Sequence, residues 1–206
     1  MVAFTAGVSA RSKSDVLNCM LLAQLAANVV ADREKKTQEW YAKYREVLEN
    51  IGWAISKFSF DHMTLSGTTF QVKEAVLKLI AAIASENALL ISQATIAMVE
   101  SLGEGDDRVA LFSSSSTNSD SGNFQVGAVV EDDGSPTMAL AANYFSADEV
   151  KTDFLWFHFS TSTTTLYNSG QTISLSEDIY KKVRQQIIDK LGARAETYIA
   201  DLDIGI

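Results

Sequence analysis

The fold depends first on residues 75–102, AVLKLIAAIASENALLISQATIAMVESL, which are mainly apolar with scattered polar residues such as Asn87 and Gln93. Between Leu79 and Val99 the only charged residue is Glu86. A helix that is apolar around most of its circumference must be covered by protein or by lipid. Because another apolar helix is expected earlier in the chain, we predict that this stretch is buried inside the fold.

The earlier helix begins near Ser14 and runs to about Asn50, since no proline or glycine interrupts it. Its apolar side is formed by residues that recur at helical spacing: Val16, Leu17, Met20, Leu21, Gln24, Leu25, Asn28 and Val29. Gly52 follows its C-terminal end. The charged segment that begins at Asp32 leaves an alternative open, in which two helices are separated by a break at that point.

After Gly52 the sequence alternates with a period of two, which predicts a strand to about Leu65. Thr68 or Thr69 then caps a second long helix that ends at Leu102. The two long helices would pack along one another through their apolar faces.

The second half of the chain is rich in β-favouring residues. Five short runs are separated by polar or acidic turn segments: 108–114, 124–131, 137–145, 154–161 and 164–175. Few helix-forming residues lie between these runs, which indicates an antiparallel meander. A third helix is predicted from Ile179 to Leu191, where Gly192 ends it, and a shorter helix follows over 193–200.

Together these elements predict an α+β fold, with two long N-terminal helices packed with an antiparallel β-sheet meander and C-terminal helices. A single domain spanning residues 1–206 is expected. Within it, residues 1–105 form a mainly helical part with a short strand, and residues 106–206 form the sheet and the C-terminal helices.

The net charge of −9 excludes some partner classes. Residues 103–206 hold the excess, with seven basic and sixteen acidic side chains. An acidic surface repels phosphate backbones, so no nucleic acid partner is expected, and anionic membranes are disfavoured for the same reason. The N-terminal sequence has no basic and apolar signal-peptide pattern, so we expect a cytoplasmic protein or one exported without a cleaved signal.

Candidate nucleophiles and bases are few. Cys19 falls on the apolar side of the first helix, where a thiol behaves as a small hydrophobic group. His158 lies within a β-favouring run and is expected to be a structural residue. His62, which follows Asp61, is the best candidate base for a small hydrolase. No nucleotide-binding, dinucleotide-binding or serine-hydrolase motif is present, so no catalytic residue and no cofactor are assigned.

Acidic clusters in the predicted loops are candidate ligands for a hard cation such as Ca²⁺. They comprise Glu104, Asp106 and Asp107; Glu131, Asp132 and Asp133; and Asp148, Glu149 and Asp153. Their spacing does not match an EF-hand, and acidic turns are usually only solvated. No metal site is therefore assigned.

Aromatic residues gather on the first helix, on the strand after it and in a late β-favouring run. Strand residues that are apolar on both faces need cover on both sides, from the chain itself or from a partner. The sequence therefore suggests a partner surface made of Trp40, Tyr44, Trp53, Phe58, Phe60, Trp156 and Phe157.

A resemblance to a known group rests on residues 40–45, WYAKYR, on Ile51 to Trp53, and on the closing helix from Ile179 through Ile204. These segments resemble the small accessory proteins encoded beside bacterial tripartite helical pore-forming toxins of the motility-associated killing factor type. The resemblance implies a toxin-associated protein without assigned chemistry, and it transfers no functional residue.

The sequence thus predicts a non-enzymatic accessory or interaction protein of a bacterial toxin or virulence system, which binds a protein partner or associates with itself. One alternative is a membrane-active effector of the pore-forming type that inserts helix 75–102, with Glu86, Asn87 and Gln93 facing a pore. The other is a small hydrolase or metal-dependent enzyme. Membrane contact is the less favoured of the partner classes.

Overall fold

The computed structural model describes residues 1–55, 61–62, 67–83, 88–102, 116–117, 120–148 and 158–201. The chain forms two compact units, each built from separate parts of the sequence. Unit 1 contains Met1–Val8 and Ile55–Ser174, and unit 2 contains Ser9–Ala54 and Leu175–Ile206. The α+β class is confirmed, but the units do not divide at residue 105, where the helical and sheet-rich parts were expected to meet.

The sheet of unit 1 is mixed. Its strands run in the order β1, β5, β6, β8, and β3 also pairs with β8. Their bounds are β1 Val2–Phe4, β3 Asp61–His62, β5 Ser121–Asp132, β6 Ser135–Ser146 and β8 Thr165–Leu175. The predicted antiparallel pairing is confirmed for β5, β6 and β8. The parallel pairing of β1 with β5 was not predicted, because no sequence pattern links strands so far apart.

A two-residue turn joins β5 to β6. Asp133 and Gly134 both have positive φ, 46° and 76°, and the flanking residues Asp132 and Ser135 are paired. Positive φ at both central positions is typical of a type I′ turn, whose twist matches that of the strands it joins. Asp133, one of the acidic loop residues, therefore has a structural role in fixing the register of this hairpin.

The predicted second long helix is wrong in its start, and two helices that pack against one another are found in its place. Residues Thr69–Gln71 form β4, which pairs with β7 (His158–Ser160) in a separate two-stranded sheet. Helix α3 (Val72–Ile83) follows directly, and α4 covers Ala88–Leu102. Pairing of β4 with β7, nearly ninety residues later in the chain, overrides the local preference for a helix.

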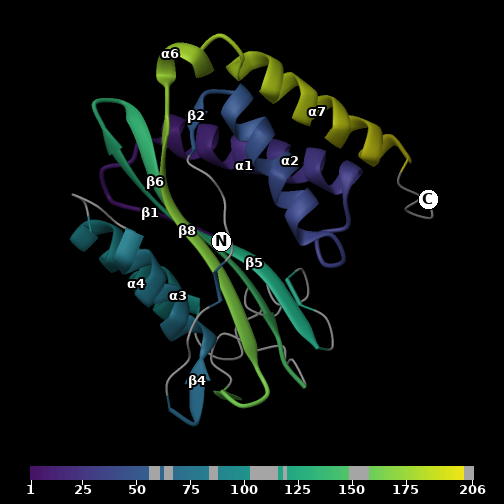
Figure 1. Cartoon of the computed structure of the whole chain (residues 1–206). Coiled ribbons are helices and arrows are strands. Elements are labelled where there is room, and N and C mark those ends of the chain that lie inside the picture. The colour runs from purple at the N-terminus through teal and green to yellow at the C-terminus, as the bar shows by residue number, and fades with distance from the viewer. Residues whose placement is uncertain are drawn as a thin grey trace, which may run out of the picture. The chain divides into compact units, whose positions relative to one another are not determined.

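Helices α3 and α4 pack together against the sheet of unit 1 (Figure 1). Val72, Val76 and Ile80 lie on one side of α3, and they are fully or almost fully buried together with Phe124 and Phe145 of the sheet. Burial in protein, the preferred interpretation of the apolar stretch, is thus what the structure shows for this side of α3. None of the helices in the described ranges has the length and hydropathy that crossing a membrane requires.

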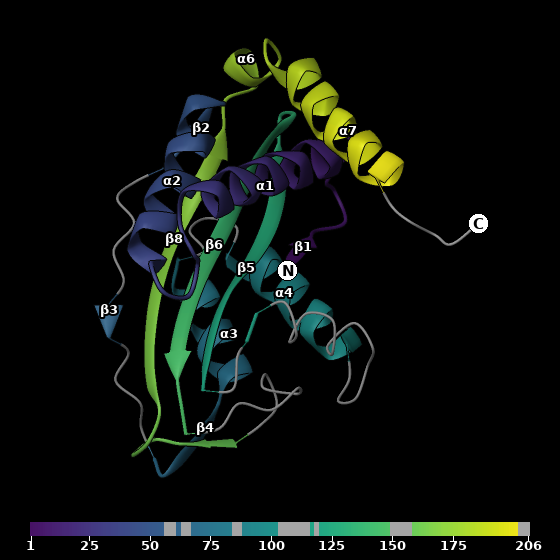
Figure 2. The ribbon, with the colours of Figure 1, turned by 90° about the vertical axis from the view of Figure 1, so that its right-hand side faces the viewer.

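Unit 2 is helical. It contains α1 (Ala10–Val30), α2 (Thr37–Asn50), the two-residue strand β2 (Trp53–Ala54), α6 (Glu177–Tyr180) and α7 (Arg184–Asp201). Both α2 and α7 pack against α1, and Figure 2 shows these three helices from a second side. Because α6 and α7 come late in the sequence, unit 2 combines an early segment of the chain with a late one.

The first long helix is broken, as the alternative predicted. Asp32 Oδ1 accepts hydrogen bonds from the backbone N–H groups of Glu34 at 2.9 Å and Lys35 at 3.0 Å. A carboxylate that binds amides two and three residues later competes with helical hydrogen bonding, so the helix ends before it. These bonds also lower the pKa of Asp32, because they stabilise its charged form.

Gly192 does not end a helix, contrary to the prediction. Helix α7 continues through it to Asp201. A glycine inside a helix costs about 1 kcal/mol relative to alanine but stops the helix only when the backbone turns left-handed there. Gly192 has no positive φ, so α7 continues without a break.

Candidate functional site

Three of the aromatics suggested as a partner surface are core residues of unit 2. Trp40, Tyr44 and Trp53 are 1%, 0% and 2% exposed. The Trp40 and Tyr44 rings stack with centroids 5.2 Å apart, and Trp40 Nε1 donates to Asn28 Oδ1 at 2.7 Å. These contacts fill the space between α1 and α2. The other four suggested residues lie outside the described residues: Phe58, Phe60, Trp156 and Phe157.

A network of ion pairs ties α1 to α6 and α7. Arg184 Nε lies 3.0 Å from each carboxylate oxygen of Asp15, and Arg184 Nη2 donates to Glu177 Oε2 at 2.7 Å. The Asp15 side chain is only 7% exposed and that of Arg184 is 16% exposed. The hydrogen bond to Asp15, together with that to Glu177, raises the pKa of Arg184 above its ordinary value. This arrangement satisfies every charge, so it holds the helices and offers no free acid or base.

Cys19 lies in the interior of unit 2, on the same side of α1 as Asp15. Burial raises the pKa of its thiol from 9.0 to about 11. A thiol with so high a pKa carries almost no thiolate at neutral pH and is a poor nucleophile. The structure therefore agrees with the interpretation of Cys19 as a core residue.

Neither histidine lies in a catalytic arrangement within the described residues. His62 is exposed in β3, and its ring packs edge-on against Tyr167 with centroids 5.4 Å apart. His158 is exposed in β7, and its Nε2 lies 3.0 Å from Nε2 of Gln71. The two histidines thus have separate structural neighbours.

Acidic residues do not form a metal centre in the part of the chain that can be described, where no group of three potential ligands is found. Asp132 and Asp133 lie at the β5–β6 turn, and Asp148 follows β6. Glu104, Asp106, Asp107, Glu149 and Asp153 lie outside the described residues.

The remaining candidate for a functional surface on unit 2 is the outer side of α1. Leu17, Leu21 and Val29 are 49%, 44% and 86% exposed, and Leu25 shares their spacing of four residues. At 3.6 residues per turn these side chains lie opposite the buried side of the helix. No charged residue occurs between Val16 and Ala31, so this outer side is aliphatic with only uncharged polar neighbours.

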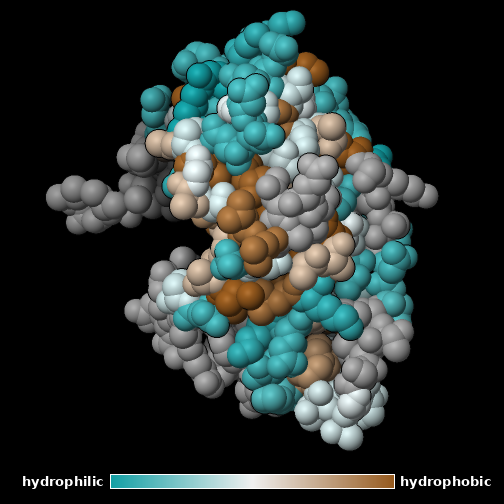
Figure 3. Space-filling view, turned by 90° about the vertical axis from the view of Figure 1, so that its left-hand side faces the viewer, coloured by the Kyte–Doolittle hydropathy of each residue, from teal (hydrophilic) through white to brown (hydrophobic). Residues whose placement is uncertain are grey.

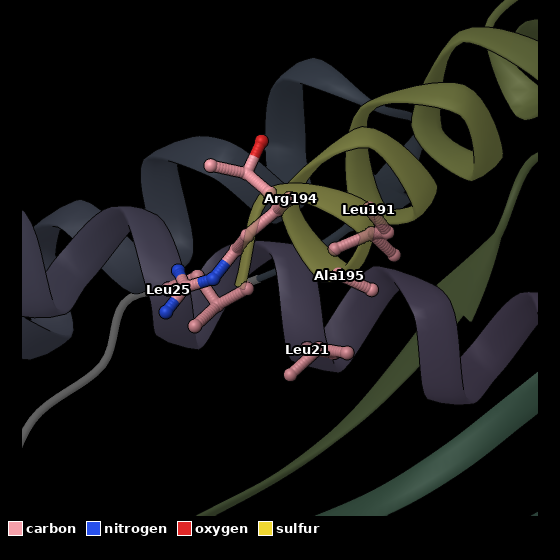
Figure 4. A pocket seen from close by; sticks show the side chains of 6 residues that line it. Leu21, Leu25, Leu191, Arg194 and Ala195 are labelled. Atoms are coloured by element: carbon pink, nitrogen blue, oxygen red, sulfur yellow. The ribbon is translucent and has the colours of Figure 1, made fainter. Parts of the chain in front are cut away.

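An open apolar groove of about 640 Å³ lies where α7 passes this outer side (Figure 4). It is lined by Leu21 and Leu25 of α1 and by Leu191, Arg194, Ala195 and Thr197 of α7. In Figure 4 the Arg194 side chain extends from α7 toward Leu25, with its guanidinium at the edge of the groove. Both walls belong to unit 2, which makes the groove a single continuous site.

Charge is distributed unevenly around this groove. Lys190 precedes Arg194 by four residues, one helical turn, so both lie on the same side of α7. Both are exposed, and no carboxylate in the described ranges pairs with either of them. Asp189 and Glu196 lie on another side of α7, because each residue advances the helix by about 100°. The α7 edge of the groove is therefore basic, while the α1 edge is uncharged.

Unit 1 carries a second exposed apolar surface, on α4. Leu89, Leu90 and Ile96 are 70%, 52% and 39% exposed. Figure 3 views the molecule from the side on which α4 lies in Figure 1, and hydrophobic residues are exposed on that face. On this side of α4 the exposed polar residues include Gln93 and Glu100, whereas a groove with described lining residues is found on unit 2. We therefore treat the groove of unit 2 as the candidate site.

Of the residues that line this groove, Leu21 and Leu25 were predicted only as part of an apolar helix side, and Arg194, Ala195 and Thr197 were not predicted as site residues. Leu17, Leu21, Leu25 and Val29 were grouped with Val16 and Met20 as one apolar side of a helix. These apolar residues spread around most of the helix circumference, so they cannot all face a single neighbour. That spread was the sequence signal for an additional exposed apolar side.

Comparison with known proteins identified no family, since neither a family model nor a curated protein matches this sequence. Solved structures with some likeness include a delta-endotoxin, at 9% identity and a TM-score of 0.46 over 85% of this chain and 80% of that one. Another is the activated Cyt2Ba monomer from Bacillus thuringiensis subsp. israelensis, at 7% identity and a TM-score of 0.45 over 85% of this chain and 96% of that one. The Evf virulence factor has 12% identity and a TM-score of 0.42, over 92% of this chain and 76% of that one. At these values the likenesses assign neither a family nor a function to this chain.

Proposed function

We propose that this chain is a non-enzymatic accessory protein of a bacterial toxin or virulence system, and that it acts by binding another protein through the groove between α1 and α7. The observation that supports this proposal is the aliphatic, uncharged outer side of α1. Each 100 Å² of apolar surface left in water costs about 2.5 kcal/mol relative to burial, so a partner that covers this side gains affinity.

The shape of the groove favours a protein over a small molecule. Small-ligand sites enclose most of the ligand surface and present several converging polar groups. This groove is open, and its polar lining residues are Arg194 and Thr197. The net charge of −9 disfavours nucleic acid as the occupant.

The toxin or virulence context in this proposal comes from the sequence resemblance carried by Trp40–Arg45, Ile51–Trp53 and the closing helix. The resemblance implies a toxin-associated protein without assigned chemistry. A binding surface is what such a role requires, and an active site is not.

Site-specific photo-crosslinking tests the proposal. A photoreactive amino acid is placed at Leu21 in the groove, and the full chain is irradiated in its native cells. We expect a discrete crosslinked band that contains a second protein, identified by mass spectrometry. The matched control is Ala42, which is exposed on α2 of the same unit.

The outcomes separate the proposal from its alternatives. Crosslinks from Leu21 but not from Ala42 support a specific partner at the groove, and light scattering of the purified chain shows whether that partner is a second copy. Equal crosslinking from both positions, or none from Leu21, contradicts the proposal.

A further inference from the structure

We infer that the groove between α1 and α7 binds an amphipathic helix of another protein, which places acidic side chains along its α7 edge. This inference rests on the proposed function and adds the chemistry of the partner. Its basis is the form of the groove, the length of its aliphatic wall and the charges at its two edges.

The groove has the form of a helix-binding site. Two helices that pack side by side leave a furrow between their surfaces, and a third helix fills such a furrow with its own side chains at an axis separation of about 8–10 Å. Leu21 and Leu25 of α1 and Leu191 and Ala195 of α7 supply an aliphatic floor. An extended peptide would need free strand edges to satisfy its backbone, and both walls here are helices.

The length of the wall sets the length of the guest. On α7 the lining residues run from Leu191 to Thr197, an advance of six residues or about 9 Å along the helix axis. A guest helix of about eight residues, just over two turns, covers this distance. Its apolar residues would recur at i, i+3 or i+4, and i+7, the spacing of helices that bind in grooves.

The charges beside the groove determine which flank of the bound helix is acidic. Arg194 lines the groove on α7, Lys190 lies one turn away on the same side of that helix, and neither has a carboxylate partner in the described part of the chain. The α1 edge offers no charge from Val16 to Ala31. A guest with Asp or Glu on the flank facing α7 gains two charge pairs, whereas a basic flank there meets two like charges.

The net charge of the chain limits how acidic the guest is. At −9 the whole chain repels polyanions at long range, so a short acidic flank is favoured over an acidic tract. The aliphatic side of the guest supplies the affinity, and the acidic flank fixes its direction in the groove.

A displayed library of helical peptides tests the inference on the full chain. Each peptide carries leucines at i, i+4 and i+7, and its two flanks are randomised among aspartate, serine and lysine. Selection on the wild-type chain is expected to enrich aspartate on one flank only. The best aspartate peptide and its lysine counterpart are then compared by fluorescence anisotropy, with an expected preference of about tenfold for aspartate.

Charge reversal supplies the decisive variant. In Lys190→Glu/Arg194→Glu the preference is expected to invert, so that the lysine peptide binds more tightly. The control, Lys35→Glu/Lys36→Glu, makes the same change in net charge at exposed residues of the segment before α2 and keeps the wild-type preference. Circular dichroism confirms that both variants remain folded.

Several results would overturn the inference. Peptides that bind without charge preference, or an equal response of both variants, refute the acidic flank, while crosslinking at Leu21 would still support a protein partner. Displacement of the peptide by neutral phosphatidylcholine vesicles would show that the groove prefers lipid. If no helical peptide binds but a partner is crosslinked at Leu21, the proposed function is still supported. The partner then does not bind as an amphipathic helix.

Discussion

Both sides of helix α1 are mainly apolar, but only the inner side is buried. On the inner side, Asp15, Cys19 and Met20 are at most 6% exposed, and they contact α6, α7 or α2. On the outer side, Leu17 and Leu21 remain 49% and 44% exposed. The inner side also contains Asp15, the last charged residue of α1, whose carboxylate is paired with Arg184.

The contrast shows that hydrophobicity alone does not mark a binding surface. A buried charge such as Asp15 is tolerated only where an opposite charge is held beside it, so the inner side is specified by its ion pair. Among the described residues, no ion pair involves the outer side of α1 between Val16 and Val30. Its aliphatic residues are therefore available to another molecule.

The largest effect is expected from breaking the inner ion pair. Asp15→Ala leaves the largely buried guanidinium of Arg184 with only Glu177, and we expect it to lower the free energy of unfolding by about 3 kcal/mol. Urea unfolding followed by the fluorescence of Trp40 and Trp53 measures this change in unit 2, in a Trp156→Phe background.

The matched control uses the outer member of the same network. Arg11 pairs with Glu177 at 3.0 Å, but its side chain is 65% exposed. Arg11→Ala should change the free energy of unfolding by less than about 1 kcal/mol. Equal effects of the two substitutions would show that the buried pair does not distinguish the inner side.

A smaller effect is expected from alkaline pH. The pKa of Cys19 is about 11 in the folded chain and near 9.0 in the unfolded chain, because burial disfavours the thiolate. A raised folded pKa gives stability that is complete below pH 9 and is lost as the pH rises toward 11, by about 2–3 kcal/mol.

Cys19→Ala isolates this contribution, since every other titratable group is the same in both proteins. At pH 8 the variant should be the less stable of the two because it loses packing. The difference should shrink or reverse by pH 11, as measured by urea unfolding at each pH. A constant difference across this range would mean that Cys19 is not buried as the structure shows.

The smallest effect on stability is expected on the outer side. Leu21→Gln should lower the free energy of unfolding by less than about 1 kcal/mol, because the side chain is already 44% exposed. The same substitution at the neighbouring Met20, which is 6% exposed and accepts a hydrogen bond from Tyr44, should cost about 2 kcal/mol or more. Thermal unfolding of both variants compares the two sides directly, and similar losses would remove the distinction between them.

Much of the local structure was predictable from the sequence. The runs 124–131, 137–145 and 164–175 became β5, β6 and β8, because alternation and flanking turn residues are local signals. The break near Asp32 was open as an alternative for the same reason, since a carboxylate captures amides two and three residues away. The burial of Cys19 also followed from its place on an apolar helix side.

The candidate site was not predictable in the same way. Trp40, Tyr44 and Trp53 were named as a partner surface because aromatic residues favour both cores and interfaces, and composition does not separate these uses. The leucines of the groove were named only as part of a helix face. Which part of that face is covered depends on α7, more than 150 residues later in the chain.

The sequence by itself determined the α+β class, the apolar character of α1 around most of its circumference and the uneven charge of the chain. The tertiary structure alone decided that Arg184 reaches Asp15 across 169 residues, that β1 pairs in parallel with β5, and that one side of α1 stays open beside α7. The physical reason is that periodicity and turn chemistry act over a few residues, whereas burial is settled by contacts between segments that only folding brings together.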